Sequence, residues 1–167
     1  MDGDTCGGLS PIAGIDKAFL RKWLVWLETA GISESGPWPV LGAVTKQAPT
    51  AELRPQAEDP AENQTDEGDL MPYPILDAIE RHAIRDKKFP RDTFEIMHAT
   101  HPDIGAAQMR GWVVKFYRLW CRNQWKRERY APSFHLDDKN LDPKTWCRFP
   151  ILSGGFAAEL ARLTEEL

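Results

Sequence analysis

The segment Ala48–Asp69 reads APTAELRPQAEDPAENQTDEGD and separates two helical blocks of the chain. It contains three prolines and seven carboxylates, but almost no large apolar side chain. Such a composition cannot bury enough apolar surface to pack as a helix or a strand. A long loop inside a compact domain is either a functional lid or a disordered linker, and composition alone favours neither.

The overall composition is that of one soluble globular domain. The chain has 167 residues, of which 42% are hydrophobic and 28% charged. The net charge of −4 does not indicate nucleic-acid binding, although acidic residues cluster in 52–69 and basic residues in 110–129. No apolar run is long enough to cross a membrane. Three scattered cysteines without a Cys-x-x-Cys pair argue against a disulfide scaffold and indicate a reducing cytoplasm: Cys6, Cys121 and Cys147.

Apolar residues at three- and four-residue spacing predict a mainly α-helical chain. One helix follows Asp16 and ends at Gly31, and its apolar stripe is Leu20, Trp23, Leu24 and Leu27. The first 15 residues and residues 131–150 read as loop, and the only strand candidate, 146–152, contains a proline. The other expected helices cover about 37–46, 72–86, 91–97, 104–124 and 156–167.

Three groups of residues could carry chemistry, and each also has a simpler interpretation. Lys17 follows a glycine-rich loop at a helix start, where it could hold phosphate or simply be solvated. Thr50 and the triplet 65–67 could bind nucleotide or Mg²⁺, or serve only as turn residues. The basic and aromatic stretch 118–130 could bind phosphates and stack a base, or form a solvated helix face over core aromatics.

Two further patterns carry no predicted chemistry. The four histidines have no metal-ligand spacing with the cysteines, so no metal site is expected: His82, His98, His101 and His135. Ser153-Gly154-Gly155 opens a helix as a phosphate loop would, but neither Lys-Ser/Thr nor Asp-Ser follows it. It therefore reads as a turn.

Four short motifs follow one another along the chain. They are Gly3-Asp4…Gly7-Gly8-Leu-Ser-Pro-Ile…Lys17, then Pro49-Thr50-Ala51-Glu52-Leu53, then Gln64-Thr65-Asp66-Glu67 before Tyr73-Pro-Ile-Leu-Asp77, and then Asn123-Gln-Trp125-Lys126-Arg127 with Ala131-Pro132. Taken in order, these motifs resemble one family, the glutamine-dependent NAD(+) synthetases, and specifically their C-terminal part. They occur in the family's order and cover most of residues 1–135, whereas the tail 133–156 looks like a subgroup feature.

The resemblance implies an ATP-dependent carbon–nitrogen ligase. In this family ATP adenylates the carboxylate of deamido-NAD(+), and ammonia from a separate glutaminase domain attacks the acyl-adenylate. The family's Ser-Gly-Gly-x-Asp-Ser pyrophosphate loop, with its magnesium-binding aspartate, is not in this sequence, nor is the glutaminase domain. The resemblance therefore predicts the helical C-terminal half of a doubly wound α/β synthetase domain. ATP and Mg²⁺ are the expected cofactors, with magnesium ligands mainly outside this chain.

The same resemblance assigns ATP contacts. Lys17 is expected to meet an ATP phosphate, and Thr50 is the threonine of the family's Pro-Thr-Ala segment. The 48–69 segment resembles the family's loop that orders over bound nucleotide, which favours the lid over the linker. Within it, Thr65, Asp66 and Glu67 are the expected lid residues.

Deamido-NAD(+) contacts follow from two other motifs. Lys126 resembles the lysine of the family's His-Lys-Arg motif, and Trp125 stands in place of the histidine. Asp4 belongs to the family's Gly-Asp segment near the deamido-NAD(+) pocket, whereas Gly8 replaces a frequent aspartate. No residue is assigned a catalytic role.

These expectations describe one partial synthetase domain over 1–167. It comprises a glycine-rich loop and helices (1–47), the lid (48–69), helices (70–130) and a tail with a last helix (131–167). The expected partners are the missing N-terminal half, the glutaminase domain and a second copy in a homodimer, with no role for membrane or nucleic acid. Two alternatives stay open: a helical nucleotide- or nucleic-acid-binding module that uses the 110–129 face, and a non-functional remnant.

Overall fold

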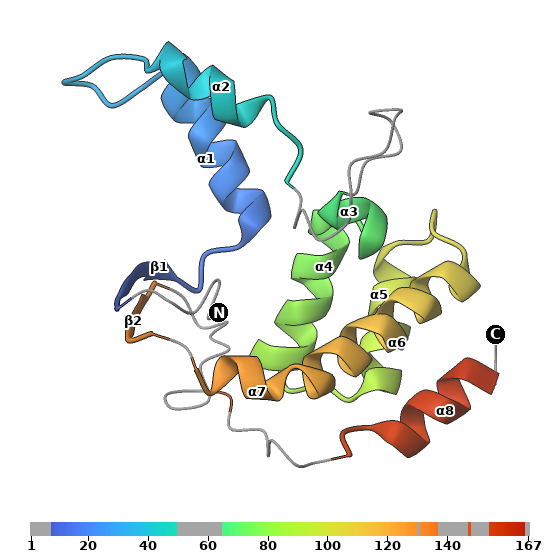
Figure 1. Cartoon of the computed structure of the whole chain (residues 1–167). Helices are drawn as coiled ribbons and strands as arrows, with labels where there is room; N and C mark the ends of the chain where they lie inside the picture. The colour runs from blue at the N-terminus through green and yellow to red at the C-terminus, as the bar shows by residue number, and fades with distance from the viewer. Residues whose placement is uncertain (1–7, 50–64, 130, 137–146, 148–153, 166–167) are drawn as a thin grey trace, which may run out of the picture. The chain divides into compact units, whose positions relative to one another are not determined.

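The computed structural model describes residues 8–49, 65–129, 131–136, 147 and 154–165 (Figure 1). These residues are mainly helical, as the apolar periodicity predicts, with two short strands. The chain forms two compact units, one of residues 16–75 and the other of residues 1–15 and 76–167. No described helix is both long and apolar enough to cross a membrane.

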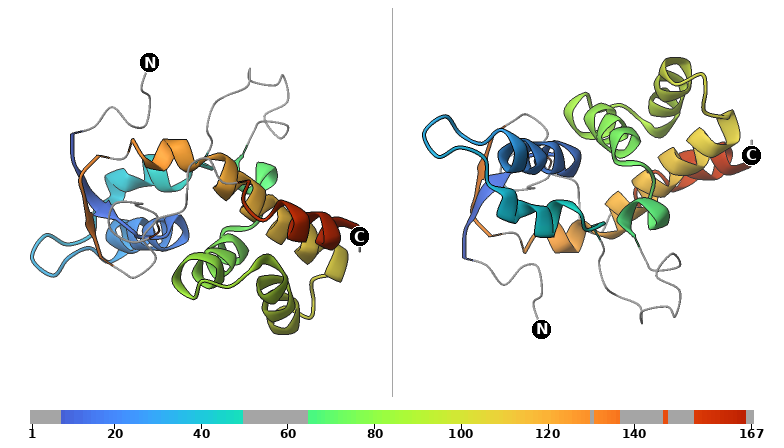
Figure 2. Two further views of the ribbon diagram at one scale, coloured as in Figure 1. Left: turned by 90° about the horizontal axis from the view of Figure 1, so that it is seen from below. Right: turned by 90° about the horizontal axis from the view of Figure 1, so that it is seen from above.

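In the 16–75 unit, α1 (Lys17–Thr29) lies beside the 3₁₀ turn η2 (Pro39–Leu41) and α2 (Gly42–Thr45) (Figures 1 and 2). Of its predicted apolar stripe only Leu27 is buried, because the described partners of α1 cover only part of its circumference. Trp23, which the periodicity assigned to the same buried stripe, is 40% exposed.

The end of α1 depends on a glycine. Gly31 has a φ of +70°, the left-handed conformation that ends many helices, and its N–H donates to the Trp26 carbonyl at 3.1 Å. A Cβ on Gly31 would lie 1.7 Å from the carbonyl oxygen of Gly36. No other residue therefore fits this turn without moving its backbone.

The segment before α4 contains a helix that the composition did not predict. Residues 66–69 form the short helix α3 (Asp66–Asp69), although the whole 48–69 stretch was expected to be irregular. The side chain of Thr65 caps α3 by accepting a hydrogen bond from the Gly68 N–H at 3.1 Å. Three acidic residues in its first turn suit the positive end of the helix dipole, which explains why so polar a stretch still turns helical here.

The helix expected over 72–86 has two parts. It begins as α4 (Tyr73–Glu80) and continues as a π turn, η4 (Arg81–Arg85), in which the Asp86 N–H donates to the Arg81 carbonyl at 3.0 Å. The extra residue of the π turn places Ala83 and Ile84, adjacent in sequence, both in buried positions.

The core of the larger unit is formed by three helices, α5 (Pro90–Thr100), α6 (Ala106–Arg122) and α8 (Ala157–Glu165), with α8 lying along α6 (Figure 2). The helices predicted over 91–97, 104–124 and 156–167 are thus confirmed. A short helix, α7 (Gln124–Arg127), follows α6. The side chains fully buried in this unit include Ile79, Ile84, Thr93, Met97, Met109, Val113, Tyr117 and Leu163.

Two strands form where loop was predicted. β1 (Ser10–Ala13) pairs in parallel with β2 (Ser133–His135), with Ser10 opposite Ser133 and Ala13 opposite His135. Each strand is too short to display an alternating pattern, and its partner lies far away in sequence, so the prediction of loop was wrong. The predicted strand 146–152 lies outside the described residues except for Cys147, which is in no strand.

Candidate functional site

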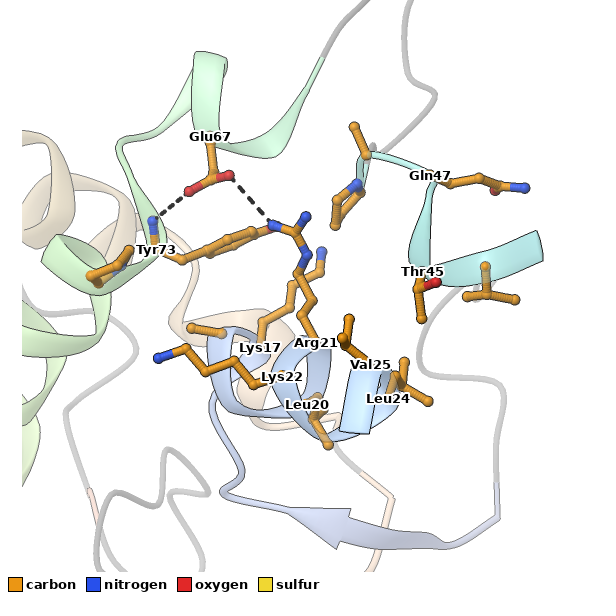
Figure 3. Close-up of a pocket in the computed structure, with 15 residues that line it drawn as sticks. Lys17, Leu20, Arg21, Lys22, Leu24, Val25, Thr45, Gln47, Glu67 and Tyr73 are labelled. Carbon is orange, nitrogen blue, oxygen red and sulfur yellow. Dashed lines mark hydrogen bonds and ion pairs between the residues drawn. The ribbon is translucent and has the colours of Figure 1, made fainter. Parts of the chain in front are cut away.

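A groove of about 870 Å³ opens on the 16–75 unit, along the exposed face of α1 (Figure 3). Its volume is in the range of small-molecule sites. Lys17 and Arg21 of α1 lie on one wall, since residues four apart share a helix face, and Lys22 also lines the groove. The rest of the lining is largely apolar, with Thr45 and Gln47 as neutral polar groups, and includes Leu20, Leu24, Val25, Val44, Pro49 and Pro74.

Lys17 is held at the edge of this groove by two residues from the segment 65–73. Its ammonium forms an ion pair with the Asp66 carboxylate, whose Oδ2 also accepts a hydrogen bond from the Tyr73 hydroxyl at 3.0 Å. The ammonium lies 5.6 Å from the centre of the Tyr73 ring. The Lys17 side chain stays 50% exposed, whereas that of Asp66 is 17% exposed. The lysine is therefore fixed in place but still accessible.

A second pair runs parallel to the first. The Arg21 guanidinium lies 3.5 Å from Glu67 Oε2, and the other carboxylate oxygen of Glu67 accepts the Tyr73 backbone N–H at 2.9 Å. Figure 3 shows Arg21 reaching from α1 towards this carboxylate. The guanidinium is 5.8 Å from the Tyr73 ring. Together the two pairs join α3 and the start of α4 to α1.

The charges of this cluster are set by its hydrogen bonds. Burial alone would lower the pKa of the Lys17 ammonium, but hydrogen bonds with Asp66 and Tyr73 outweigh it, and the pKa lies above its ordinary value. Hydrogen bonding to Lys17 holds the pKa of the Asp66 carboxyl below its usual range. Burial raises the pKa of the Tyr73 phenol. The Lys17–Asp66 pair is therefore charged at neutral pH, and the Arg21–Glu67 pair and Lys22 lie beside it.

Such a groove has the chemistry to bind an anion attached to a less polar group. Lysine and arginine provide N–H donors for phosphate or carboxylate, and the Leu and Val side chains provide apolar surface. Among the described residues, no group of three or more His, Cys, Asp or Glu side chains could hold a metal ion. The cations and the apolar surface of the groove are thus suited to an organic anion.

In the other unit, α7 presents a cation beside an aromatic ring. Trp125 is 48% exposed, and the Lys126 ammonium lies 5.8 Å from the centre of its ring. The flanking residues Gln124 and Arg127 are buried, with exposed fractions of 3% and 9%. A ligand could therefore meet Trp125 and Lys126 but not their neighbours.

Several cations of the 110–129 stretch are engaged within their own unit. The guanidinium of Arg110 lies 4.7 Å from the centre of the Phe94 ring, and Arg118 donates to the Thr164 hydroxyl at 3.3 Å. Arg127 lies against the Trp120 ring and donates to its carbonyl. This part of the sequence is therefore less available to a polyanion than its composition indicates.

The site residues predicted from sequence fall into three groups. Lys17 and the lid residues Asp66 and Glu67 come together on one groove, where Thr65 acts as the helix cap. Trp125 and Lys126 lie side by side on α7, and the two remaining predicted residues, Asp4 and Thr50, are outside the described residues. Sequence reasoning assigned no role to two members of the groove: Arg21, whose spacing of four from Lys17 was a usable signal, and Tyr73, which lies in one of the matching segments.

Comparison with known proteins points to one family. No family model matches the chain. The chain is 32% identical over 152 residues to the glutamine-dependent NAD(+) synthetase of Xanthomonas campestris pv. campestris. The matched region covers 91% of this chain and 23% of that protein. It is 30% identical over 148 residues to the enzyme of the same name from Drosophila melanogaster, with coverage of 86% and 18%.

A solved structure agrees with these relatives. The crystal structure of a glutamine-dependent NAD(+) synthetase from Cytophaga hutchinsonii matches 98% of this chain with a TM-score of 0.72 and 43% sequence identity. The match covers 23% of that protein. In sequence and in fold, the chain is thus similar to glutamine-dependent NAD(+) synthetases, and it spans less than a quarter of the length of the relatives it matches.

Proposed function

We propose that this chain forms the C-terminal part of a glutamine-dependent NAD(+) synthetase and contributes part of its ATP and deamido-NAD(+) site. The observation that carries the proposal is the match of nearly the whole chain to a synthetase of known structure. The full reaction would be the ATP-driven amidation of deamido-NAD(+), with ammonia taken from glutamine. Its pyrophosphate loop and its glutaminase would lie outside these 167 residues, in a cytoplasmic enzyme.

Residues 1–167 are proposed to form one partial domain, the helical half of a doubly wound α/β domain. The parallel pairing of β1 with β2 supports this, because parallel sheets are normally larger and covered on both faces. Ile12 on β1 and Phe134 on β2 are 46% and 62% exposed. We infer that the sheet continues, and that these side chains become covered, in the remainder of the synthetase.

The groove on α1 is proposed to bind the phosphates of ATP. Lys17 supplies a positive charge at the mouth of the groove, where it neutralises the triphosphate and then the departing pyrophosphate. Thr50 is proposed as a second ATP contact. Asp66 and Glu67 anchor the end of the lid segment to α1, with Thr65 as the cap of α3, and a closed lid would exclude the water that hydrolyses an acyl-adenylate.

The exposed pair on α7 is proposed to meet deamido-NAD(+). Lys126 would bind an anionic group of the dinucleotide, and Trp125 offers a planar face on which a ring can stack. Asp4 is proposed to lie near the same substrate. When bound, Mg²⁺ supplies charge neutralisation to the phosphates, but no described cluster fits it, so its ligands are proposed to lie elsewhere in the enzyme.

A chimera tests this proposal. The corresponding segment of the Cytophaga hutchinsonii synthetase is replaced by residues 1–167, and NAD(+) formation is measured with ammonia as the nitrogen source. We expect turnover, and we expect Lys17→Met to raise the KM for ATP by about ten- to hundredfold, the value of a charged hydrogen bond. Lys46→Met, which removes an exposed lysine outside the groove, is the matched control. A folded chimera without activity would overturn the proposal and favour a non-functional remnant.

A further inference from the structure

The two end residues of α7 differ in burial from the two residues between them, and we assign the two pairs different roles. Gln124 and Arg127 are buried, whereas Trp125 and Lys126, between them, are exposed. Residues three apart share a helix face, so the first and last residues of α7 point into the unit and the middle two point outward. The buried pair is polar, and a buried polar pair needs a reason.

The reason is found at the end of α6. The Trp120 carbonyl lies in the last turn of α6, where helix carbonyls can accept hydrogen bonds from side chains. This carbonyl accepts the Gln124 side-chain amide at 3.0 Å and also the Arg127 guanidinium. The guanidinium lies 5.5 Å from the centre of the Trp120 ring. One carbonyl thus anchors both ends of α7, and the positive charge suits the negative end of the α6 dipole.

The outward pair depends on this anchor. Lys126 and Trp125 belong to a helix of only four residues, which cannot persist on its own in water. Its backbone bonds are local: the Lys126 N–H donates to Asn123 at 3.1 Å and the Glu128 N–H to Gln124 at 3.3 Å. The buried side chains are therefore what fixes the direction in which the exposed pair faces.

We propose that Arg127, assisted by Gln124, is a positioning residue for deamido-NAD(+) binding, because it fixes the orientation of Trp125 and Lys126 through the Trp120 carbonyl. This inference rests on the proposed function of Lys126. The role does not require Arg127 to touch the substrate. Lysine in its place retains the charge and can still reach a terminal helix carbonyl, whereas methionine keeps only the packing.

The test uses Arg127→Met and Arg127→Lys in the chimera, with Arg122→Met as the matched loss of an exposed arginine at the end of α6. We expect Arg127→Met to lower kcat/KM for deamido-NAD(+) on the order of ten- to hundredfold, as misplaced binding groups do, with the KM for ATP unchanged. Arg127→Lys should restore most of the loss, and Arg122→Met should have no effect. A merely structural role would impair both substrates equally.

Hydrogen exchange on the 167-residue chain gives a readout that does not depend on activity. In Arg127→Met we expect faster exchange of the amides in 123–129, with α5 and the first half of α6 unchanged. Unchanged exchange, or unchanged kinetics while Lys126→Met is impaired, would overturn the positioning role. If Lys126→Met itself leaves the KM for deamido-NAD(+) unchanged, the proposed function of Lys126 fails instead.

Discussion

Replacing Tyr117 by phenylalanine should destabilise the larger unit by removing one oxygen atom. Tyr117 is 1% exposed, and its hydroxyl donates to the Lys88 carbonyl at 2.6 Å. The same oxygen lies 2.8 Å from the hydroxyl of Thr93, a fully buried residue on α5. The phenol thus joins α6 to α5 and to the loop before it.

The cost can be estimated from these two bonds. Each lost hydrogen bond contributes about 1 kcal/mol net, and a buried hydroxyl left without a partner costs about 1–3 kcal/mol. Tyr117→Phe leaves the buried Thr93 hydroxyl without the Tyr117 oxygen as its partner, so we expect a loss of about 2–4 kcal/mol in the free energy of unfolding. That is a large part of the roughly 5–15 kcal/mol that keeps a domain folded.

The assay is urea denaturation followed by circular dichroism, within a double-mutant cycle with Thr93→Val. In the Tyr117→Phe background the valine should cost less than in the wild type, because the hydroxyl it removes is no longer paired. We expect a coupling energy of about 1 kcal/mol. A loss below about 0.5 kcal/mol in Tyr117→Phe, typical of an exposed surface change, would refute the reasoning.

The same residue gives the unit a dependence on alkaline pH. Burial raises the pKa of the Tyr117 phenol far above its ordinary value, so the folded state keeps a proton that the unfolded chain releases near pH 10. Stability is therefore complete below about pH 10 and falls as the pH rises above it. Tyr117→Phe should lose this part of the alkaline dependence.

Three further changes test the smaller unit. Gly31→Ala places a Cβ 1.7 Å from the Gly36 oxygen in a residue with positive φ. We therefore expect urea denaturation to show a loss of at least about 1–3 kcal/mol in the free energy of unfolding, and an unchanged value would contradict this turn. Thr65→Ala removes the cap of α3 and should speed hydrogen exchange of the α3 amides, corresponding to about 1 kcal/mol of local stability. Hydrogen bonding to Lys17 lowers the pKa of Asp66, so its stabilisation is present above the unfolded pKa of about 4 and is lost as the pH falls through the lower folded pKa. Asp66→Asn should cost less than about 1 kcal/mol at pH 7, because the pair is partly exposed, and progressively less as the pH falls below about 4.

The helices of this chain were predictable because their signals are local. The apolar spacing of Met109, Val113 and Trp120 is sufficient to find α6, and all three are buried. α3 escaped prediction because its stabilising cap, Thr65, lies in a segment whose composition argues for loop. The two strands were not predicted because each is stabilised by pairing with the other, which lies far away in the sequence.

The groove was predictable only in part, for a similar reason. Lys17 could be singled out by its position after a glycine-rich loop, but its pairing with Asp66, 49 residues away, has no local signal. The basic run around Arg127 read as a solvated or polyanion-binding face, because charge in a sequence is normally exposed. Its burial depends on the hydrogen bond to the Trp120 carbonyl at the end of α6, which composition does not reveal.

The pairing of β1 with β2 also has a consequence for how the chain is made. Ser10 pairs with Ser133, 123 positions later in the sequence. A ribosome that adds roughly 5–20 residues per second needs about 6–25 seconds to cover that distance. Through that interval β2, the partner of β1 among the described residues, has not been made, while the helices of 17–127 emerge and pack from local contacts. Among the described elements, β1 therefore waits for a partner that is made after α1 to α7, and β1 is the segment that a chaperone would need to protect in the meantime.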